Sequence, residues 1–312
     1  MGVGERIGQF DVIIVGGGPA GMAAALWSDE LELASCLIDP ASNFGGQLHW
    51  IHNPISNYPG ATYNNGEAVY RALSKSLSSR KFTQMSDSRV ASIDHMSVAV
   101  TLDDGRDISA KAIVLSTGVR RRRLGVPGES EFKGRGVLES GSRDKGEASG
   151  RSAAVVGGGD AALENALILS EFAEKVYLIH RRDEFSAREE FVKAVSRNGR
   201  IEVILNARVK EFGGSELLEF VDLELASGGS SRIAVDNAVV RIGVQPNSEL
   251  VQGIAELDRS GYVDVDRQGQ TSASGIYAIG DVANPMSPTI STATGSASSA
   301  IKSIAHWLRK SE

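Results

Sequence analysis

Two glycine-rich turns, each set between an apolar strand and an alanine-rich helix, constrain the fold of this chain more than any other feature. The first lies in DVIIVGGGPAGMAAALWSDELELASCLID, residues 11 to 39, which reads as strand, turn, helix, strand and a final acid. Within this βαβ unit, Gly16 permits the tight turn, Gly18 lets the backbone approach a pyrophosphate, and Gly21 permits close helix-to-strand packing. A pyrophosphate is expected at the helix N-terminus, where unpaired N–H groups and the helix dipole favour negative charge.

The second unit is SAAVVGGGDAALENALILSEFAEKVYLIHRRDEF, residues 152 to 185. Gly157, Gly159 and Ala162 occupy the three positions that the glycines occupy in the first unit, and another helix again leads into another strand. Two such units predict two bound dinucleotides, because each unit provides one turn and one helix N-terminus for a pyrophosphate.

The two units differ in the residues after the second strand. Asp39 stands 23 residues after the first glycine of its turn, and His180, followed by Arg181 and Arg182, stands 23 residues after its own. An acid accepts hydrogen bonds from ribose hydroxyls, whereas arginines pair with a 2′-phosphate. We therefore expect FAD at the first site and NADPH, in preference to NADH, at the second. The alternative at the second site is that the two arginines only solvate a strand end.

Composition excludes several classes of function. The 312 residues are 41% hydrophobic and 23% charged, enough for about two globular domains. A net charge of −6 gives no general attraction to nucleic acid or to an anionic membrane. No run approaches the roughly 18 apolar residues of a membrane span, and the first hydrophobic run opens directly into the glycine turn. We expect a cytoplasmic protein with no nucleic-acid partner, no membrane partner and no metal site.

The sequence contains a single cysteine, Cys36, in LASCLIDP. One cysteine can form neither a disulfide nor an active-site dithiol within one chain. Its neighbours Leu37 and Ile38 favour a buried strand, in which a thiol is unreactive. We therefore assign Cys36 no catalytic role.

The rest of the chain repeats one plan. Strand meanders are expected after each βαβ unit, over residues 89–119 and 201–247. SGIYAIGDVANP then places Asp281 after a short buried strand, and TISTATGSASSAIKSIAHWLRK is typical of a helix. This C-terminal segment completes the first nucleotide domain, so the second is inserted into it. The predicted fold class is α/β, with two Rossmann-like three-layer domains: residues 1–118 with 244–312 for FAD, and 119–243 for NADPH.

Eight motifs together resemble the low-molecular-weight thioredoxin reductase family of two-domain FAD proteins over nearly the whole chain. They are GGGPAG (16–21), GGQL (45–48), STG (116–118), GVPGESEFKGRGV (125–137), GGGDAALENAL (157–167), HRRDEF (180–185), IGVQPN (242–247) and GIYAIGDV (275–282). The resemblance implies a homodimer. It implies that FAD is bound by Gly16, Gly18, Ala20, Gly21, Asp39, Gln47, Thr117, Gly118 and Asp281. It implies that NADPH is bound by Gly157, Gly159, Asp160, Ala161, Ala162, His180, Arg181 and Arg182.

The sequence departs from the family at the redox relay. In disulfide-reducing members GRGV is followed two residues later by Cys-x-x-Cys-Asp, which aligns here with residues 140–144, SGSRD. The two cysteine positions are Ser140 and Arg143. A serine hydroxyl cannot replace a redox cysteine, because it cannot enter thiol exchange. Asp144 matches the family's acid, and without a dithiolate to protonate we expect a solvated loop acid instead of a catalytic one.

A second departure concerns the 2′-phosphate. Ser186 stands where the family has the third arginine of its phosphate cluster. Arg188, two residues further on, is a candidate replacement, and the sequence leaves this open.

A chain without the relay also resembles the thioredoxin-reductase-type ferredoxin or flavodoxin NADP reductases. We therefore predict an FAD-dependent NADPH oxidoreductase that passes electrons through the flavin, with no catalytic side chain, to an external acceptor such as ferredoxin, flavodoxin or a small molecule. Arg120 to Arg123, RRRR, is either a docking patch for an acidic carrier or a solvated or NADPH-facing linker. The alternatives are a thioredoxin-reductase-like disulfide or small-molecule reductase using substrate thiols, and a sensor that binds both cofactors without turnover.

Overall fold

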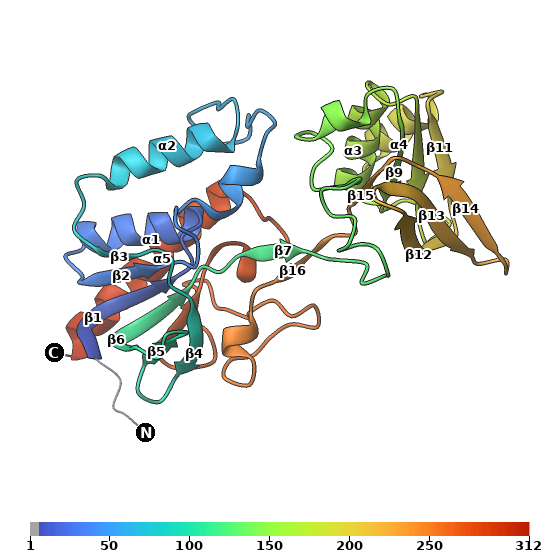
Figure 1. Cartoon of the computed structure of the whole chain (residues 1–312). Helices are drawn as coiled ribbons and strands as arrows, with labels where there is room; N and C mark the ends of the chain where they lie inside the picture. The colour runs from blue at the N-terminus through green and yellow to red at the C-terminus, as the bar shows by residue number, and fades with distance from the viewer. Residues whose placement is uncertain (1–5, 312) are drawn as a thin grey trace. The chain divides into compact units, whose positions relative to one another are not determined.

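The chain divides into two compact units, seen in the computed structural model that describes residues 6–311 (Figure 1). One unit comprises the described residues up to Arg120 together with those from Gln245 onward, and the other runs from Arg121 to Val244. Residues 1–5 and 312 of the predicted FAD domain lie outside the described residues. Which nucleotide each unit binds stays a prediction at this point.

A mainly parallel sheet forms the centre of the first unit. Its spatial order is β3-β2-β1-β6-β5-β4, and β17 pairs with the second half of β6. The parallel strands are β1 (Arg6–Val15), β2 (Ser35–Ile38), β3 (Thr83–Met85), β6 (Asp107–Leu115) and β17 (Ile276–Ala278). An antiparallel hairpin of β4 (Val90–Asp94) and β5 (Ala99–Leu102) extends the sheet from the first half of β6.

The parallel strands end level with one another. Val15 lies opposite both Ile38 and Leu115, and Leu115 lies opposite Ala278. The residues that come directly after these strands therefore leave the sheet at one edge: Gly16, Asp39, Ser116 and Ile279. This edge is where a parallel α/β sheet places its ligands.

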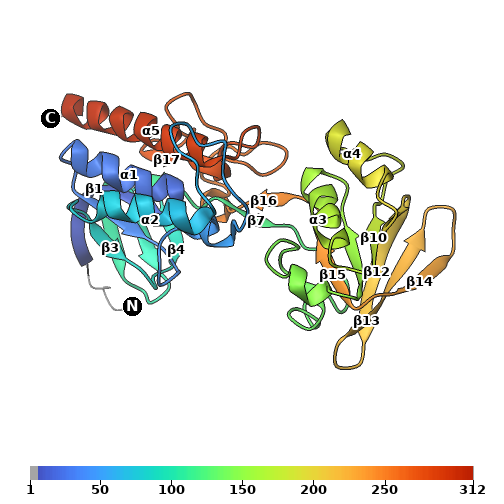
Figure 2. The ribbon, with the colours of Figure 1, turned by 90° about the horizontal axis from the view of Figure 1, so that it is seen from above.

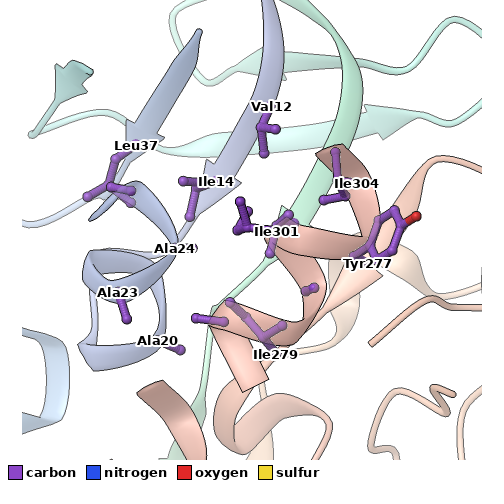
Figure 3. Close-up of a cluster of buried hydrophobic side chains, with 14 of the residues drawn as sticks. Val12, Ile14, Ala20, Ala23, Ala24, Leu37, Tyr277, Ile279, Ile301 and Ile304 are labelled. Carbon is purple, nitrogen blue, oxygen red and sulfur yellow. The ribbon is translucent and has the colours of Figure 1, made fainter. Parts of the chain in front are cut away.

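Helices cover one face of this sheet, namely α1 (Pro19–Glu30), α2 (Gly66–Leu77) and the long α5 (Ile290–Ser311) (Figure 2). Val12 and Ile14 of β1 point toward this helical layer, in which α1 contributes mostly alanines such as Ala24 (Figure 3). Small side chains let the helix approach the sheet closely. Ile13 and Val15 point to a second core on the opposite face, as strand alternation requires. Full burial of one such aliphatic side chain stabilises the fold by about 1.5–3 kcal/mol.

Short 3₁₀ turns follow the strand ends of this unit. They are η1 (Gly46–Trp50), η3 (Glu249–Val251) and η4 (Gly280–Val282).

The second unit has three layers of its own. Its sheet is parallel throughout, in the order β11-β10-β9-β15-β8. The strands are β8 (Val137–Leu138), β9 (Ser152–Val156), β10 (Lys175–Ile179), β11 (Ile201–Ile204) and β15 (Asn237–Val240). Helices α3 (Asp160–Ser170) and α4 (Glu189–Ser196), with the 3₁₀ turn η2 (Lys145–Ala148), pack on one face. An antiparallel sheet of β12 (Ala207–Gly214), β13 (Leu218–Leu225) and β14 (Ser230–Ala234) packs on the other.

The carboxyl ends of the parallel strands are level with one another in the second unit too. Val156 lies opposite Ile179 and Val240, and Val239 lies opposite Leu138. The glycine turn, His180 and the loop that begins at Glu139 therefore meet at one sheet edge. Where the chain passes between the units, β7 (Val119–Arg121) and β16 (Val244–Pro246) form a two-stranded sheet.

The second meander that the sequence predicted is divided between two sheets in the structure. The segment IEVILNARVKEFGG was expected to lie in the meander as a whole, but its first part is β11 of the parallel sheet and its second part is β12. The break falls at Asn206, whose φ of +55° is a left-handed conformation that ends a strand. The hydrophobic pattern runs through this break, because both pieces bury apolar side chains.

Cys36 lies on β2 with no exposed surface, as its neighbours predicted. Burial raises the pKa of its thiol to about 12. No helix within residues 6–311 is both long enough and apolar enough to cross a membrane.

We expect Cys36 to be unreactive in the folded protein, because almost none of it is thiolate at pH 8 and no reagent can reach it. Titration with a chromogenic disulfide reagent should give no thiol under native conditions and one thiol per chain in guanidinium chloride. Cys36→Ala, which should give none in either condition, is the control. Rapid reaction of the native protein with unchanged circular dichroism would contradict this assignment.

Candidate functional site

The first glycine turn leaves no room for a side chain at two of its glycines, whereas a third is open. Gly16 has φ +106°, and a Cβ there would lie 2.6 Å from the Ser116 carbonyl oxygen. A Cβ on Gly21 would lie 1.9 Å from the carbonyl oxygen of Gly16, so α1 can pack on the turn only with glycine there. Gly18, the N-cap of α1, has nothing within 4 Å of its Cβ position. This open side beside a helix N-terminus fits a pyrophosphate.

Asp39 braces this turn. Its carboxylate accepts a hydrogen bond from the backbone N–H of Gly17 at 2.5 Å and another from Ala41 at 2.8 Å. An ionised carboxylate has about four lone-pair positions, so two remain for ribose hydroxyls. Asp39 therefore fits the predicted ribose contact and also fixes the shape of the turn. Ala20 is buried in the first turn of α1.

The other predicted FAD residues converge on the same edge from distant parts of the chain. Gln47 donates to the Asp281 carboxylate at 3.5 Å across 234 positions of sequence. Burial raises the pKa of Asp281, and this hydrogen bond opposes the shift.

Thr117 and Gly118 are held by Asn247. The Thr117 hydroxyl donates to the Asn247 carbonyl at 2.6 Å, and the Asn247 backbone N–H donates to the Gly118 carbonyl at 2.9 Å. The Asn247 amide also donates to the Thr117 carbonyl at 2.7 Å. Asn247 was assigned no role of its own from the sequence. Its place in the IGVQPN motif was the signal by which it could have been identified as a site residue.

The second glycine turn repeats the geometry of the first with different neighbours. Gly157 has φ +151°, and its Cβ would lie 2.1 Å from the carbonyl oxygen of Arg241. A Cβ on Gly158 would lie 2.2 Å from the ring of His180. Gly159, the N-cap of α3, has no atom closer than 3.9 Å to its Cβ position. The open side of the turn is again at the helix N-terminus, where Ala161 is exposed and Ala162 is buried.

His180 lies beneath this turn and is only 9% exposed. Its ring packs against Phe185 at 5.5 Å between centroids. Burial lowers the pKa of the imidazole, and the charges of Arg182 and Arg181 lower it further, so His180 is neutral at pH 7. Its Nε2 has no hydrogen-bond partner among the described residues. A buried polar atom of this kind fits a site completed by a bound nucleotide.

The arginines near the turn differ in whether their side chains have partners within the chain. Arg181 and Arg182 are exposed, and neither side chain donates a hydrogen bond to the described part of the chain. Arg188 is engaged, because its Nε contacts Asp160 at 2.7 Å and its Nη1 contacts Glu190 at 2.7 Å. Arg188 would have to leave these two carboxylates to replace the arginine missing at position 186, and Asp160 is paired at the first residue of α3.

The loop after β8 is held together by Asp144. This carboxylate accepts from the backbone N–H groups of Glu139 and Ser140, both at 3.0 Å, and pairs with Arg143. Its side chain is 9% exposed. Burial alone would raise the pKa of Asp144, but the Arg143 guanidinium and the Ser140 amide outweigh it and hold the pKa below its ordinary value. The expectation of a solvated acid is not met, because Asp144 is a partly buried brace whose carboxylate is largely shielded from solvent.

Two further arginines meet this loop at the carbonyl of Glu139. Arg241 donates to it at 2.7 Å and to Val240 at 2.8 Å, and Arg121 donates to the same oxygen. Burial, followed by the charge of Arg121, lowers the pKa of Arg241 to about 10. Both arginines remain charged at pH 7 and fix the start of the loop.

The arginine run is mostly committed to contacts within the chain. Arg120 pairs with Glu249 and donates to Asn247, while Arg122 donates from Nε to the Val244 carbonyl at 2.8 Å. With Arg121 on Glu139, three of the four side chains have intramolecular partners. The linker interpretation of this run therefore fits better than the docking patch.

Residues 6–311 contain no group of three or more His, Cys, Asp and Glu side chains placed to hold a metal ion.

Comparisons with known proteins agree with this geometry. The family model described as pyridine nucleotide-disulphide oxidoreductase matches residues 10–302. The thioredoxin reductase of Mycolicibacterium smegmatis is 34% identical over 308 residues, covering 97% of each chain. The solved structure of Lactococcus lactis thioredoxin reductase superposes with a TM-score of 0.85 at 28% identity, covering 96% of this chain and 99% of that one. That of T. acidophilum thioredoxin reductase gives 0.82 at 25% identity, with coverages of 96% and 99%. The predicted α/β fold with two Rossmann-like domains is confirmed.

We expect removal of Arg181 and Arg182 together to abolish the preference for NADPH. Charge-assisted hydrogen bonds to a phosphate contribute about 1.5–3 kcal/mol, so kcat/KM for NADPH should fall about 10- to 100-fold in Arg181→Ala/Arg182→Ala. The value for NADH should change by less than about twofold, because NADH lacks the 2′-phosphate. The ratio of the two values is the measurement, and an unchanged ratio would show that the arginines only solvate the strand end.

Asp144→Asn should destabilise the second unit in a pH-dependent way. The folded pKa of Asp144 is lowered, so its stabilisation is full above the unfolded pKa, near 3.9, and is lost as pH falls through the folded pKa. We expect the variant to lose about 1–3 kcal/mol at pH 7 and less at pH 3.5, measured by urea unfolding. Asp183→Asn, which removes an exposed acid, is the control and should have little effect. An equal loss at both pH values would contradict the ionic role.

Proposed function

The chain belongs to the pyridine nucleotide-disulphide oxidoreductase family, and we propose that it uses NADPH to reduce an acceptor carrying its own disulfide, or a similar small oxidised molecule, without a protein disulfide. It is an NAD(P)H-dependent flavoprotein oxidoreductase, with FAD and NADPH as its cofactors. The acceptor is the part that we propose. The overall reaction balances as NADPH + H⁺ + RSSR giving NADP⁺ + 2 RSH.

The observation that carries this proposal is the loop after β8. Residues 140–143 occupy the place expected for the relay, and they contain no thiol. The only cysteine of the sequence, Cys36, is fully buried in the other unit. Any thiol that takes part in disulfide exchange must therefore come from the substrate. When bound, FAD supplies a two-electron couple that accepts a hydride from NADPH and passes electrons to the acceptor.

We propose that the chain's own residues bind and orient the two cofactors. The turn at Gly16 to Gly18 would bind the FAD pyrophosphate, Asp39 its ribose, and Gln47 with Asp281 the neighbouring edge. The turn at Gly157 to Gly159 would bind the NADPH pyrophosphate, with His180 beneath it.

The comparisons favour the thioredoxin-reductase-like alternative over the ferredoxin or flavodoxin acceptor expected first. The relatives from M. smegmatis and L. lactis are named thioredoxin reductases, and three of the four arginines offered as a docking patch are engaged within the chain. A small redox protein carrying a disulfide is accordingly the partner class that we propose. A homodimer is the assembly that we propose, on the family resemblance alone.

The test of this function is reduction of the bound flavin followed by a panel of acceptors. Without oxygen, NADPH should bleach the yellow colour within seconds, and adding a small disulfide should restore it while releasing two thiols per NADPH. Thioredoxin, ferredoxin, flavodoxin and a quinone form the other arms. Chemical reduction by dithionite, followed by the same acceptors, is the control that bypasses NADPH.

Two outcomes would contradict the proposal. Colour that persists after NADPH but disappears with dithionite would indicate a sensor that binds cofactors without turnover. Rapid reoxidation by ferredoxin or flavodoxin, with no thiol released from any disulfide, would restore the acceptor that we expected first.

A further inference from the structure

A cavity of about 390 Å³ lies in the second unit, next to the strand end that carries His180. Its wall includes Arg181 from the segment after β10, Asn206 just before β12, Arg208 from β12, and Glu224 from β13. Arg182 is not part of the wall. The cavity therefore brings together two arginines that are 27 residues apart in the sequence.

Backbone hydrogen bonds fix this arrangement. The Asn206 N–H donates to the Arg182 carbonyl at 3.1 Å, and the Ala207 N–H donates to the His180 carbonyl at 3.1 Å. The left-handed turn at Asn206 thus ties the first residues of β12 to the segment after β10. Arg208 comes one residue after the second of these bonds, so its position relative to Arg181 is set by the fold.

The charges around the cavity leave an excess of positive charge. Neither Arg181 nor Arg208 donates a side-chain hydrogen bond to the described residues, and both are exposed. Glu224, directly opposite Arg208 in the β12–β13 register, is the one carboxylate among the lining residues. Two guanidinium groups against one carboxylate favour an anion, and a guanidinium matches a phosphate in bidentate geometry.

Arg182 does not line the cavity, and the two other candidates near the turn are uncharged or already paired. The Ser186 hydroxyl donates to the Gly158 carbonyl at 3.2 Å and carries no charge. Arg188 is held by Asp160 and Glu190. The ribose of a dinucleotide bound at the second glycine turn lies at the end of the following strand, which is where Arg181 begins the cavity wall.

We propose that this cavity binds the 2′-phosphate of NADPH between Arg181 and Arg208, and that Arg208 acts with Arg181 in selecting NADPH over NADH. The inference rests on the proposed use of a nicotinamide nucleotide and adds to it a specificity residue from the neighbouring antiparallel sheet. The negative charge of Glu224 repels the phosphate and lowers the affinity of the site for it.

The test is isothermal titration of the full-length, FAD-loaded protein with two nucleotides that differ by one phosphate. Adenosine 2′,5′-bisphosphate carries the 2′-phosphate, and adenosine 5′-monophosphate does not. Arg208→Ala should weaken binding of the bisphosphate at least about tenfold and change that of the monophosphate less than about twofold. Arg208→Lys, which keeps the charge but not the fork, should give an intermediate value.

Two further variants control for the change in net charge and for misfolding. Arg197→Ala removes an exposed arginine at the C-terminal end of α4 and should leave both nucleotides unchanged, which controls for net charge. Glu224→Gln should strengthen binding of the bisphosphate alone. A destabilised protein would not gain affinity, so this variant separates electrostatics from misfolding.

The possible results of this titration distinguish failure of the proposed phosphate site from failure of the proposed function. Equal effects of Arg208→Ala on both nucleotides, or no effect on either, would overturn the role of Arg208 while leaving the proposed function intact. Selective loss of the bisphosphate in a protein whose flavin is not reduced by NADPH would support the site and contradict the function. Failure of the unmodified protein to bind either nucleotide would overturn both.

Discussion

In-register parallel pairing is the constraint on which both candidate sites depend. Val15 aligned with Ile38 and Leu115 places the first glycine turn, its acid and Ser116 at one sheet edge, and Val156 aligned with Ile179 does the same for the second turn. A slip of one residue would turn every following side chain to the opposite face. The buried aliphatic residues on both faces of each sheet oppose such a slip, so the cores of the two units determine where the candidate cofactor-binding residues lie.

The parts of the sites that the sequence predicted are those controlled by local geometry. Gly16 is required by its φ of +106°, and Gly21 because a Cβ there would collide with the Gly16 carbonyl oxygen. The βαβ pattern indicates both without any knowledge of the rest of the fold. Asn247 holds Thr117 from 130 positions away, and Arg208 lines one cavity with Arg181, which is 27 positions away. No periodicity in the sequence marks such pairs. The partial burial of Asp144 was missed for a different reason. Its partners Glu139, Ser140 and Arg143 lie within five positions of it, but a short polar loop looks solvated until its fold is known.

The arginine run shows how a charge pattern in sequence can mislead. Four consecutive basic residues suggest one positive surface, yet side chains along an extended strand alternate in direction. Arg120 reaches Asn247 and Glu249, whereas Arg121 reaches the Glu139 carbonyl. Each charge is partly offset by a different acceptor. Arg181 and Arg208 are the opposite case, because they are far apart in sequence and share one cavity.

The loop after β8 occupies the place where the family resemblance leads us to expect a redox relay, and it therefore bears on the acceptor that we propose. Its shape is fixed by the Asp144 carboxylate, by Arg143, and by the Gly141 N–H, which donates to Asn165 of α3 at 2.9 Å. Because these contacts involve no thiol, the loop can keep its place at the sheet edge when both cysteines are replaced. Cys36 cannot take over, since it is buried in β2 with its pKa raised to about 12. Under the function that we propose, a disulfide substrate would approach the bound flavin itself, which favours a small or protruding disulfide over one buried in a large partner.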